Sequence, residues 1–287
     1  MILITGAAGF IGSCLVDSFG DEDVISCDVA RKEMLTPEEC VLFLKNPTHP
    51  VNAVYHLGAI SSTTTRDVVK LTDNNIRFSA ELMELCITRG IPFIYASSAS
   101  VYGLANTMQK ETDSVAPLNY YAISKTAFDM YALQKMKDHP SSHIIGLRYF
   151  NVYGHREHDK GDQASPVHKF ITQARSTGEI KIFEGSDDFL RDFVYIDDVV
   201  SITRHAPKLR QNGIYNVGTG VARSFKAVAA IIARACGADI VEIPFPEHLK
   251  NKYQTYTCSD NTKITSAGYI MPRLGLEAGI KKVLQEV

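Results

Sequence analysis

The order of apolar and polar positions predicts alternating strands and helices in the first half of the chain. Short apolar or β-branched runs predict buried strands at residues 2–5, 24–28, 51–56, 93–96 and 144–149. Longer stretches between them predict helices at residues 10–19 and 68–88, one starting at Thr36-Pro37 and one holding Tyr121. Strands alternating with helices of this length imply right-handed crossovers. We therefore expect an α/β fold with a doubly wound parallel sheet.

The alternation weakens after Asn151. Residues 154–165 are charged and contain glycine, which predicts a loop. Further strands are predicted at residues 192–196, 213–217 and 241–244, and a helix at residues 224–235. We expect a smaller, discontinuous α/β lobe of about residues 151–191 and 223–287, beside a main domain of residues 1–150 and about 192–222.

Composition excludes several classes of function. The formal net charge is −2, whereas nucleic-acid-binding proteins usually show a basic excess. The six cysteines are scattered without a C-x-x-C pair, which is typical of reduced thiols in the cytosol. No apolar run approaches the roughly 20 residues of a membrane span, and Met1 leads directly into an apolar strand without a signal peptide. We expect a cytoplasmic protein that binds neither nucleic acid nor membrane.

Three glycines separate the first predicted strand from the first helix. Gly6, Gly9 and Gly12 form G-x-x-G-x-x-G, a spacing that lets the backbone approach a pyrophosphate at a helix N-terminus. Asp28 ends the next strand, where a carboxylate can accept hydrogen bonds from the adenosine ribose of NAD. Two basic residues soon after Asp28 could instead neutralise the extra phosphate of NADP. The pattern predicts a Rossmann-type dinucleotide-binding domain with one tightly bound NAD or NADP per chain.

A tyrosine and a lysine four positions apart, Tyr121 and Lys125, lie on one face of a predicted helix. An ammonium beside a phenol favours the phenolate, which can take and return a proton near neutral pH. Tyr131 and Lys135 have the same spacing. Ten residues turn an ideal helix by about 1000°, so the two pairs do not share a face. The spacing alone does not choose between them.

Three further segments follow predicted strands, at the sheet edge where ligands usually bind. They are residues 58–61, Ser98 and residues 151–154. A serine hydroxyl at a strand end can bond a substrate hydroxyl and help to hold a carbonyl, although serines in turns are more often backbone caps. Ser98 is therefore a candidate for binding substrate only if it lies beside the tyrosine.

Together, the glycine pattern, Ser98, Tyr121-x-x-x-Lys125 and the stretch 148–154 resemble the extended short-chain dehydrogenase/reductase superfamily, largely nucleotide-sugar epimerases and dehydratases. The resemblance selects Tyr121 as the acid/base. It implies that Lys125 holds the nicotinamide ribose and lowers the pKa of the tyrosine, and that Ser98 contacts the reacting hydroxyl. It also implies a substrate-binding smaller lobe and a homo-oligomer. The implied cofactor contacts are Gly6, Gly9, Phe10, Ile11, Gly12, Asp28, Gly58, Ala59, Ser61, Asn74, Tyr121, Lys125 and Val152.

Further stretches resemble one group within it, the ADP-L-glycero-D-manno-heptose 6-epimerases. They are residues 58–64, 73–75, 183–186, 191–195, 244–246 and 249–254. This resemblance implies an ADP-sugar substrate, a lipopolysaccharide precursor, and a second acid/base, Lys160. Inverting a carbon that is not acidic calls for oxidation to a ketone and return of the hydride. Two positioned acid/base groups suit hydroxyls that point in opposite directions. The implied substrate contacts are Ser98, Asn151, Phe183, Glu184, Gly185, Ser186, Arg191 and Tyr253.

Some positions depart from the pattern of this group. Val29 stands where an asparagine usually helps to hold the NADP phosphate, and His155 stands where proline is usual. Asp162 and Lys169 replace a serine and a histidine expected near the substrate. The segment between residues 28 and 51 is also shorter than usual. These departures leave the cofactor and the exact sugar open.

Three alternatives to this function remain. A UDP-hexose 4-epimerase would use Ser98 and the Tyr121 pair equally well. A nucleotide-sugar 4,6-dehydratase would need an Asp-Glu pair where Ala99-Ser100 stand. A non-catalytic dinucleotide sensor of the same fold typically lacks the tyrosine or the lysine. His155, His158 and Asp159 match no standard zinc spacing, so no metal is expected.

Overall fold

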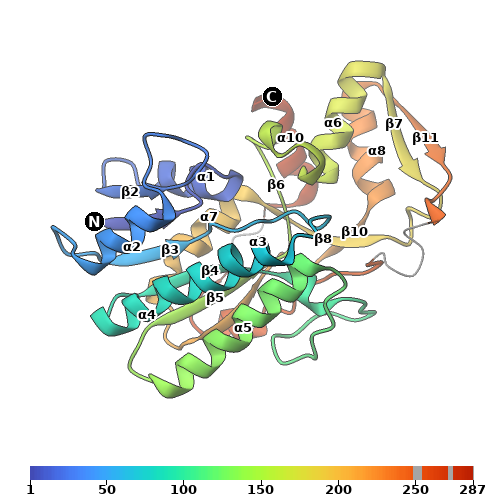
Figure 1. Cartoon of the computed structure of the whole chain (residues 1–287). Helices are drawn as coiled ribbons and strands as arrows, with labels where there is room; N and C mark the ends of the chain where they lie inside the picture. The colour runs from blue at the N-terminus through green and yellow to red at the C-terminus, as the bar shows by residue number, and fades with distance from the viewer. Residues whose placement is uncertain (248–253, 271–273, 287) are drawn as a thin grey trace.

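Six parallel strands form the central sheet, which has helices on both faces (Figure 1). The computed structural model describes residues 1–247, 254–270 and 274–286. The strands are β1 Ile2–Thr5, β2 Val24–Cys27, β3 Ala53–His56, β4 Phe93–Ser98, β5 Ile144–Tyr149 and β9 Gly213–Val217. Their order is β2-β1-β3-β4-β5-β9, so the direction of winding reverses between β1 and β3. The predicted doubly wound parallel sheet is confirmed.

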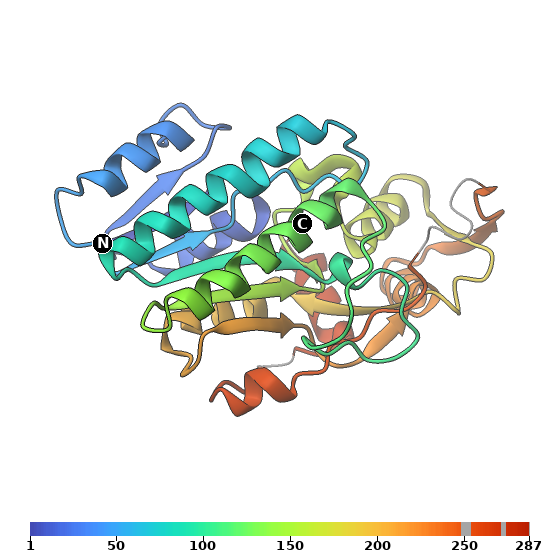
Figure 2. The same cartoon turned by 60° about the horizontal axis from the view of Figure 1, so that its bottom comes forward.

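Helices α2 Pro37–Lys45, α4 Ser79–Arg89 and α5 Tyr120–Asp138 lie side by side on one face of the sheet (Figure 2). Thr36 begins α2 with a capping box: its hydroxyl accepts from the backbone of Glu39, whose side chain bonds back to Thr36 N. The predicted helix over residues 68–88 is divided into α3 Val68–Thr72, a π-helix η1 Asp73–Phe78 and α4. Periodicity alone did not reveal this π-helical segment.

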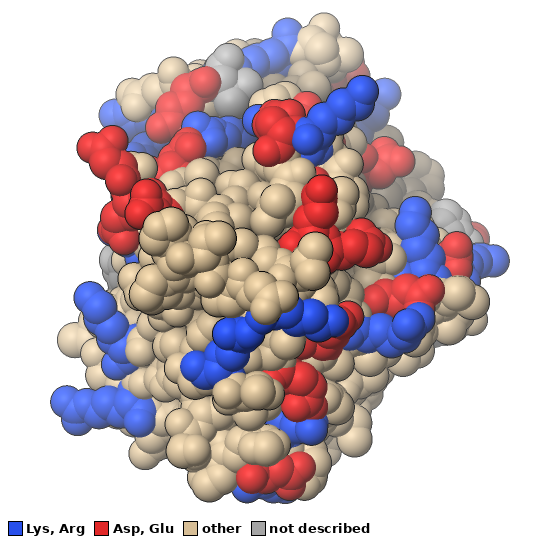
Figure 3. All heavy atoms as spheres, turned by 60° about the vertical axis from the view of Figure 1, so that its left-hand side comes forward, with Lys and Arg blue, Asp and Glu red and all other residues tan. Residues whose placement is uncertain are grey.

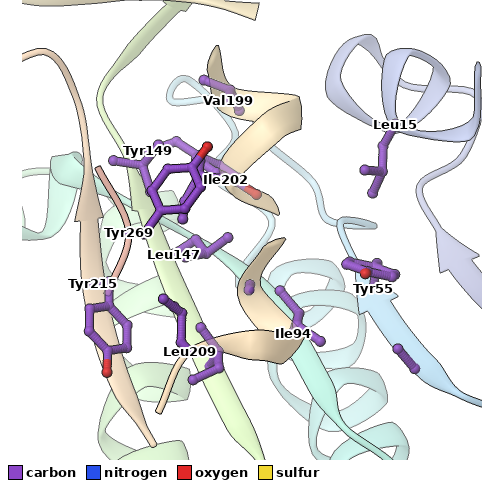
Figure 4. Packing of buried hydrophobic residues seen from close by; sticks show 14 of the residues in the cluster. Leu15, Tyr55, Ile94, Leu147, Tyr149, Val199, Ile202, Leu209, Tyr215 and Tyr269 are labelled. Carbon is purple, nitrogen blue, oxygen red and sulfur yellow. The ribbon is translucent and has the colours of Figure 1, made fainter. Parts of the chain in front are cut away.

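Helices α1 Phe10–Ser18 and α7 Ile196–His205 pack together on the opposite face. Leu15 of α1 and Ile202 of α7 are buried in the same apolar cluster as Ile94 and Leu147 of the sheet (Figure 4). Fully burying a side chain of this size contributes about 1.5–3 kcal/mol. This packing holds α1 and α7 against the central sheet.

The second half of the chain adds two smaller sheets beside the central one. One has the order β10-β8-β6, and the other pairs β7 with β11 in parallel. Their strands are β6 Asn151–Tyr153, β7 Glu179–Phe183, β8 Leu190–Tyr195, β10 Ala222–Ser224 and β11 Asp239–Ile243. In the described parts of the chain, the remaining helices are η2 Ala99–Tyr102, η3 His158–Gln163, α6 Pro166–Thr177, η4 Ala206–Lys208, α8 Phe225–Cys236, α9 Thr262–Ser266 and α10 Leu276–Glu286. The boundaries between the two lobes stay a prediction.

A buried carboxylate ties β8 to two distant loops. Asp192, with no exposed surface, accepts hydrogen bonds from the backbone N–H and hydroxyl of Thr219, at 2.7 and 2.6 Å. It also accepts from Gly220 N at 2.9 Å and from the N–H and hydroxyl of Ser259, at 3.0 and 2.7 Å. A buried charge is tolerated when its hydrogen-bonding capacity is filled in this way.

Positive and negative side chains are interspersed on the face shown in Figure 3, without a large uninterrupted basic area. Within the described ranges, we find no helix with the length and apolar character of a membrane span.

Candidate active site

A cleft of about 730 Å³ opens where the strand order reverses, at the carboxyl ends of β1 to β4. Ligands of doubly wound folds bind at such a crevice. Its lining contains all the catalytic and cofactor-binding residues predicted from the sequence, together with Asn151. They are Gly6, Gly9, Phe10, Ile11, Gly12, Asp28, Gly58, Ala59, Ser61, Asn74, Ser98, Tyr121, Lys125, Val152 and Lys160.

The glycine turn is shaped by two close backbone contacts. Gly6 has φ +69°, and a Cβ on it would lie 2.6 Å from Gly58 N. A Cβ on Gly12 would lie 1.9 Å from the carbonyl oxygen of Gly6. Gly9 is the N-cap of α1 and offers no capping side chain. The backbone N–H groups at the start of α1 are therefore available for a pyrophosphate, as in dinucleotide-binding folds.

Asp28 is fixed at the outer end of this turn. One carboxylate oxygen accepts from Ala8 N at 3.0 Å and the other from Ala30 N at 2.9 Å. Asp28, Val29 and Pro37 all line the cleft. An oriented carboxylate beside a glycine turn suits the adenosine ribose hydroxyls of a dinucleotide. The residues present therefore fit the predicted cofactor.

Tyr121 and Lys125 extend into the cleft from the first turns of α5. Asn119 caps this helix by accepting from Ala122 N at 2.8 Å. The Tyr121 phenol and the Ser98 hydroxyl are hydrogen-bonded, which joins the helix to the end of β4. The Lys125 ammonium donates to the carbonyl oxygen of Ala96 at 2.9 Å. Tyrosine, serine and lysine thus meet at one place, as the resemblance implies.

The predicted lowering of the Tyr121 pKa is wrong for this structure. Burial raises the pKa of Tyr121, and the hydrogen bond with Ser98 opposes that rise only in part. Burial also lowers the pKa of Lys125 to about 8, against the attraction of Asp129. The degree of burial could not be predicted from the spacing of the two residues, and burial is the largest effect on both pKa values.

The second Tyr-Lys pair lies outside the cleft. The Tyr131 hydroxyl donates to the Glu84 carboxylate, and Lys135 forms an ion pair with the same carboxylate. Neither residue lines the cleft. The choice of Tyr121 and Lys125 therefore rests on geometry as well as on resemblance.

The π-helix places two consecutive asparagines in different environments. Asn74 lines the cleft, whereas Asn75 is buried behind it. Asn75 accepts from Ile60 N at 2.8 Å and donates to the Ile60 carbonyl at 3.0 Å and to the Ser124 hydroxyl at 2.9 Å. It thereby ties the loop after β3 to α5. π-helical turns are frequent at functional sites.

Lys160 enters the cleft from the turn between β6 and α6. Its ammonium lies 3.2 Å from a carboxylate oxygen of Glu157 and 4.6 Å from the centre of the Phe10 ring. A cation over an aromatic face gains about 0.5–1 kcal/mol at exposed sites and more when desolvated. The structure thus brings the predicted second acid/base to the same cleft as Tyr121.

Apart from Ser98 and Asn151, the predicted substrate contacts in the described residues do not line the cleft. Phe183 ends β7, and Glu184, Gly185 and Ser186 follow it in a turn, where the buried Ser186 hydroxyl donates to the Phe183 carbonyl. Arg191 on β8 is buried, with its guanidinium 5.4 Å from the centre of the Phe225 ring. Tyr253 lies outside the described residues. Their role in binding substrate stays a prediction.

Other residues of the lining were missed by sequence reasoning. Ser97 is buried, and its hydroxyl oxygen has no hydrogen-bond partner in the described part of the protein. Gln163 accepts from Thr63 N at 3.4 Å and so connects the two sides of the cleft. Ser97 could have been predicted to line the cleft because it directly precedes Ser98. No feature of the sequence indicated Gln163.

No metal site is formed by groups of three His, Cys, Asp or Glu side chains in residues 1–247, 254–270 and 274–286. His158 pairs with Asp159 at 3.1 Å, whereas His155 lies 3.6 Å from the Cys14 sulfur and 3.3 Å from Glu286. The three residues considered above as metal ligands therefore do not converge.

Comparison with known proteins places these features in a family. The model of the family described as NAD dependent epimerase/dehydratase matches residues 2–218. An ADP-L-glycero-D-manno-heptose-6-epimerase from Alkalilimnicola ehrlichii is 42% identical over 314 residues, covering 100% of this chain and 97% of that protein.

Solved structures agree with this relationship. The ADP-L-glycero-D-manno-heptose-6-epimerase of Helicobacter pylori superposes with a TM-score of 0.86 at 30% identity, over 99% of this chain and 94% of that one. A Thermus thermophilus UDP-glucose 4-epimerase complex with NAD gives a TM-score of 0.83 at 26% identity, over 99% and 98% of the two chains. The chain belongs to the NAD dependent epimerase/dehydratase family.

Proposed function

We propose that this protein is an ADP-glycero-manno-heptose 6-epimerase, which inverts C6 by transient oxidation to a ketone. The observation that carries the proposal is that Tyr121 and Lys160 line the same cleft as the glycine turn. Two acid/base groups beside one dinucleotide site suit the inversion of a carbinol carbon. The 42% identical relative named as such an epimerase supports the choice of sugar.

Tyr121 would remove the proton of the C6 hydroxyl as the C6 hydrogen leaves as hydride. A bound NAD supplies the hydride acceptor and, on return, the hydride donor. Burial raises the pKa of Tyr121, and a positive charge bound beside its phenol would favour the phenolate. Ser98 would bond the reacting oxygen, and Lys125 would hold the nicotinamide ribose.

Lys160 would serve the other epimer, whose C6 hydroxyl points the opposite way. After oxidation the ketone presents its second face, the hydride returns to C6, and the Lys160 ammonium gives a proton to the oxygen. The net change is inversion at C6, with the cofactor returned to its starting state. After one turnover Tyr121 is protonated and Lys160 is neutral. Each must therefore exchange a proton with solvent before the next turnover in the same direction.

We further propose that the ADP part of the substrate extends from Asn151 toward the smaller lobe. Asn151 of β6 is opposite Phe193 of β8, two residues from Arg191. Its carboxamide oxygen accepts from the Thr257 hydroxyl at 3.3 Å. This arrangement supports a continuous site from Asn151 through Arg191 to the turn 183–186. Tyr253 is added to this proposal by the resemblance alone.

The function is tested by offering the purified protein ADP-D-glycero-D-manno-heptose and following the ratio of the C6 epimers by NMR. We expect the two epimers to approach a common ratio from either starting compound. UDP-glucose and UDP-galactose are offered in parallel. Their interconversion, without equilibration of the heptoses, would make the protein a UDP-hexose 4-epimerase and refute the proposed substrate.

The cofactor is NAD in this proposal, because the Asp28 carboxylate would repel the additional phosphate of NADP. Replacing Asp28 by Asn removes the charge and keeps the shape of the side chain. We expect the ratio of the two dissociation constants to move toward NADP by about tenfold, a change of about 1.4 kcal/mol. Calorimetric titration of cofactor-free protein with each dinucleotide measures it. A wild-type preference for NADP would contradict the assignment.

We also propose a cytoplasmic homo-oligomer. All six cysteines are free, which suits a reducing compartment. One side of α5 exposes four large apolar residues: Tyr120, Ile123, Met130 and Leu133. A stripe of this kind on one helix supports contact with a second copy of the chain.

A further inference from the structure

The turn from residue 154 to 165 closes around one buried carboxylate, that of Glu157. Its side chain has no exposed surface. One oxygen accepts from Gly154 N at 3.1 Å and the Ser165 hydroxyl at 2.7 Å, and the other from Ser165 N at 2.7 Å. Glu157 therefore joins both ends of the turn. The resemblance described above gave it no role.

The fourth group on this carboxylate is the Lys160 ammonium, 3.2 Å away. It contacts the oxygen that also accepts from Ser165 N. The Lys160 side chain is 26% exposed. Its ammonium contacts Glu157, and the side chain also lines the cleft. Buried charges in proteins are paired, and hydrogen bonds between charged groups are the strong ones.

Several other charged side chains near this turn have partners of their own. Within the described residues, Lys160 is the one cation that bonds to Glu157. The neighbouring contacts are His155 with Glu286, Arg156 with Asp17, His158 with Asp159, and Lys169 with the carbonyl of Asp162.

The backbone of the turn requires this support. Arg156, directly before Glu157, has φ +65°, the one positive φ of a non-glycine residue in the described ranges. Gly161, directly after Lys160, has φ 49° and ψ −126°. The Arg156 conformation costs about 1–3 kcal/mol and persists when surrounding contacts fix it, whereas glycine adopts a positive φ without this cost. Strained residues cluster at functional sites, and Arg156 directly precedes Glu157 of the Glu157–Lys160 pair.

We propose that Glu157 is the positioning residue of the second acid/base: it holds the Lys160 amine toward the cleft so that Lys160 can exchange a proton with one epimer. This inference rests on the proposed function. Without the carboxylate, the amine would keep only the Phe10 ring as a partner among the residues that the structure describes. A misplacement of 1 Å can cost about a hundredfold in rate.

The test separates the two directions of the reaction. Each heptose epimer is mixed with the full-length protein, and the transient absorbance of the reduced nicotinamide is followed by stopped flow. In Glu157→Gln we expect this transient to form about tenfold to a hundredfold more slowly from one epimer and at the wild-type rate from the other. A Lys160→Met variant should slow the same epimer more strongly.

A purely structural role would slow both epimers equally, and that result would overturn the inference. The inference would also be overturned if the transient formed at the wild-type rate in Glu157→Gln but more slowly in Lys160→Met, and the proposed function would then stand. If wild-type protein turned over neither heptose, both the inference and the proposed function would be refuted.

Two further variants complete the design. Glu286→Gln removes a carboxylate that pairs with His155 of the same turn but does not touch Lys160. It should leave both transients unchanged. Ser165→Ala removes the hydroxyl bond to Glu157 and the bond by which the same hydroxyl caps α6, from His168 N, and it should slow the same epimer to a smaller extent. If Glu157→Gln does not fold, Ser165→Ala serves as the test variant in its place. Equal slowing of both epimers in Ser165→Ala would count against the inference.

Discussion

Replacing Tyr121 by Phe should lower the rate of epimerisation by about 10³-fold, within the range expected for loss of a general acid/base. The substitution removes the phenolic oxygen that exchanges the substrate proton and bonds with Ser98. It keeps the aromatic ring that lines the cleft. The cofactor should remain bound, because the glycine turn and Asp28 are untouched.

The measurement is the approach of the two C6 epimers to equilibrium by NMR, together with the nucleotide released when the protein is denatured. Tyr131→Phe is the matched control. It removes the same atom from the same helix, but its hydroxyl bonds Glu84 outside the cleft. We expect near-normal turnover in the control. Full activity in Tyr121→Phe, or equal losses in the two variants, would contradict the assignment.

Replacing Asp192 by Ala should lower the free energy of unfolding by about 3–5 kcal/mol. The carboxylate accepts hydrogen bonds from Thr219, Gly220 and Ser259, all within 3.0 Å. Each buried donor left without a partner costs about 1–3 kcal/mol, and water entering the space would recover part of that. The effect is large because one side chain joins β8 to two loops.

Urea unfolding followed by circular dichroism measures the change in stability. The matched control is Asp187→Ala, because Asp187 is 66% exposed and pairs with Lys226 on the surface. Exposed ion pairs contribute about 0–1 kcal/mol, so the control should change the midpoint little. Equal shifts in both variants would show that burial of Asp192 does not matter.

The dinucleotide end of the site was predictable because its chemistry is contiguous in the sequence. A strand, a glycine turn and a helix follow one another within residues 2–18, and each glycine meets a local constraint. Gly12 is an example, because any Cβ there would collide with the carbonyl of Gly6. Local steric rules of this kind can be read directly from spacing.

The choice of catalytic tyrosine needed information that spacing does not contain. Tyr121 and Tyr131 each have a lysine four positions later on the same helix. What separates them is the end of β4, which brings Ser98 to one and not to the other. The pKa of Tyr121 could not be predicted for a related reason, since burial depends on chain segments far away in the sequence.

The substrate end was the least predictable part of the site. Glu157 stands in a stretch so rich in charged residues that the sequence predicts an exposed loop, yet it is 1% exposed. Its partners are spread over twelve positions, from Gly154 to Ser165, and hydrogen bonds of this kind leave no periodic pattern. The turn 183–186 and Arg191 were selected by resemblance, and they lie outside the lining of the cleft.

The π-helix between α3 and α4 limits how the chain can change in length. A π-helical turn contains about one residue more than an α-helical turn. Deleting one residue from Asp73–Phe78 would restore a regular α-helix, but would rotate the preceding segment by about 100° relative to α4. Asn74 and Asn75 could not then both keep their places, at the cleft and behind it. Single-residue insertions and deletions should therefore be tolerated less in this segment than in the surface loops of the protein.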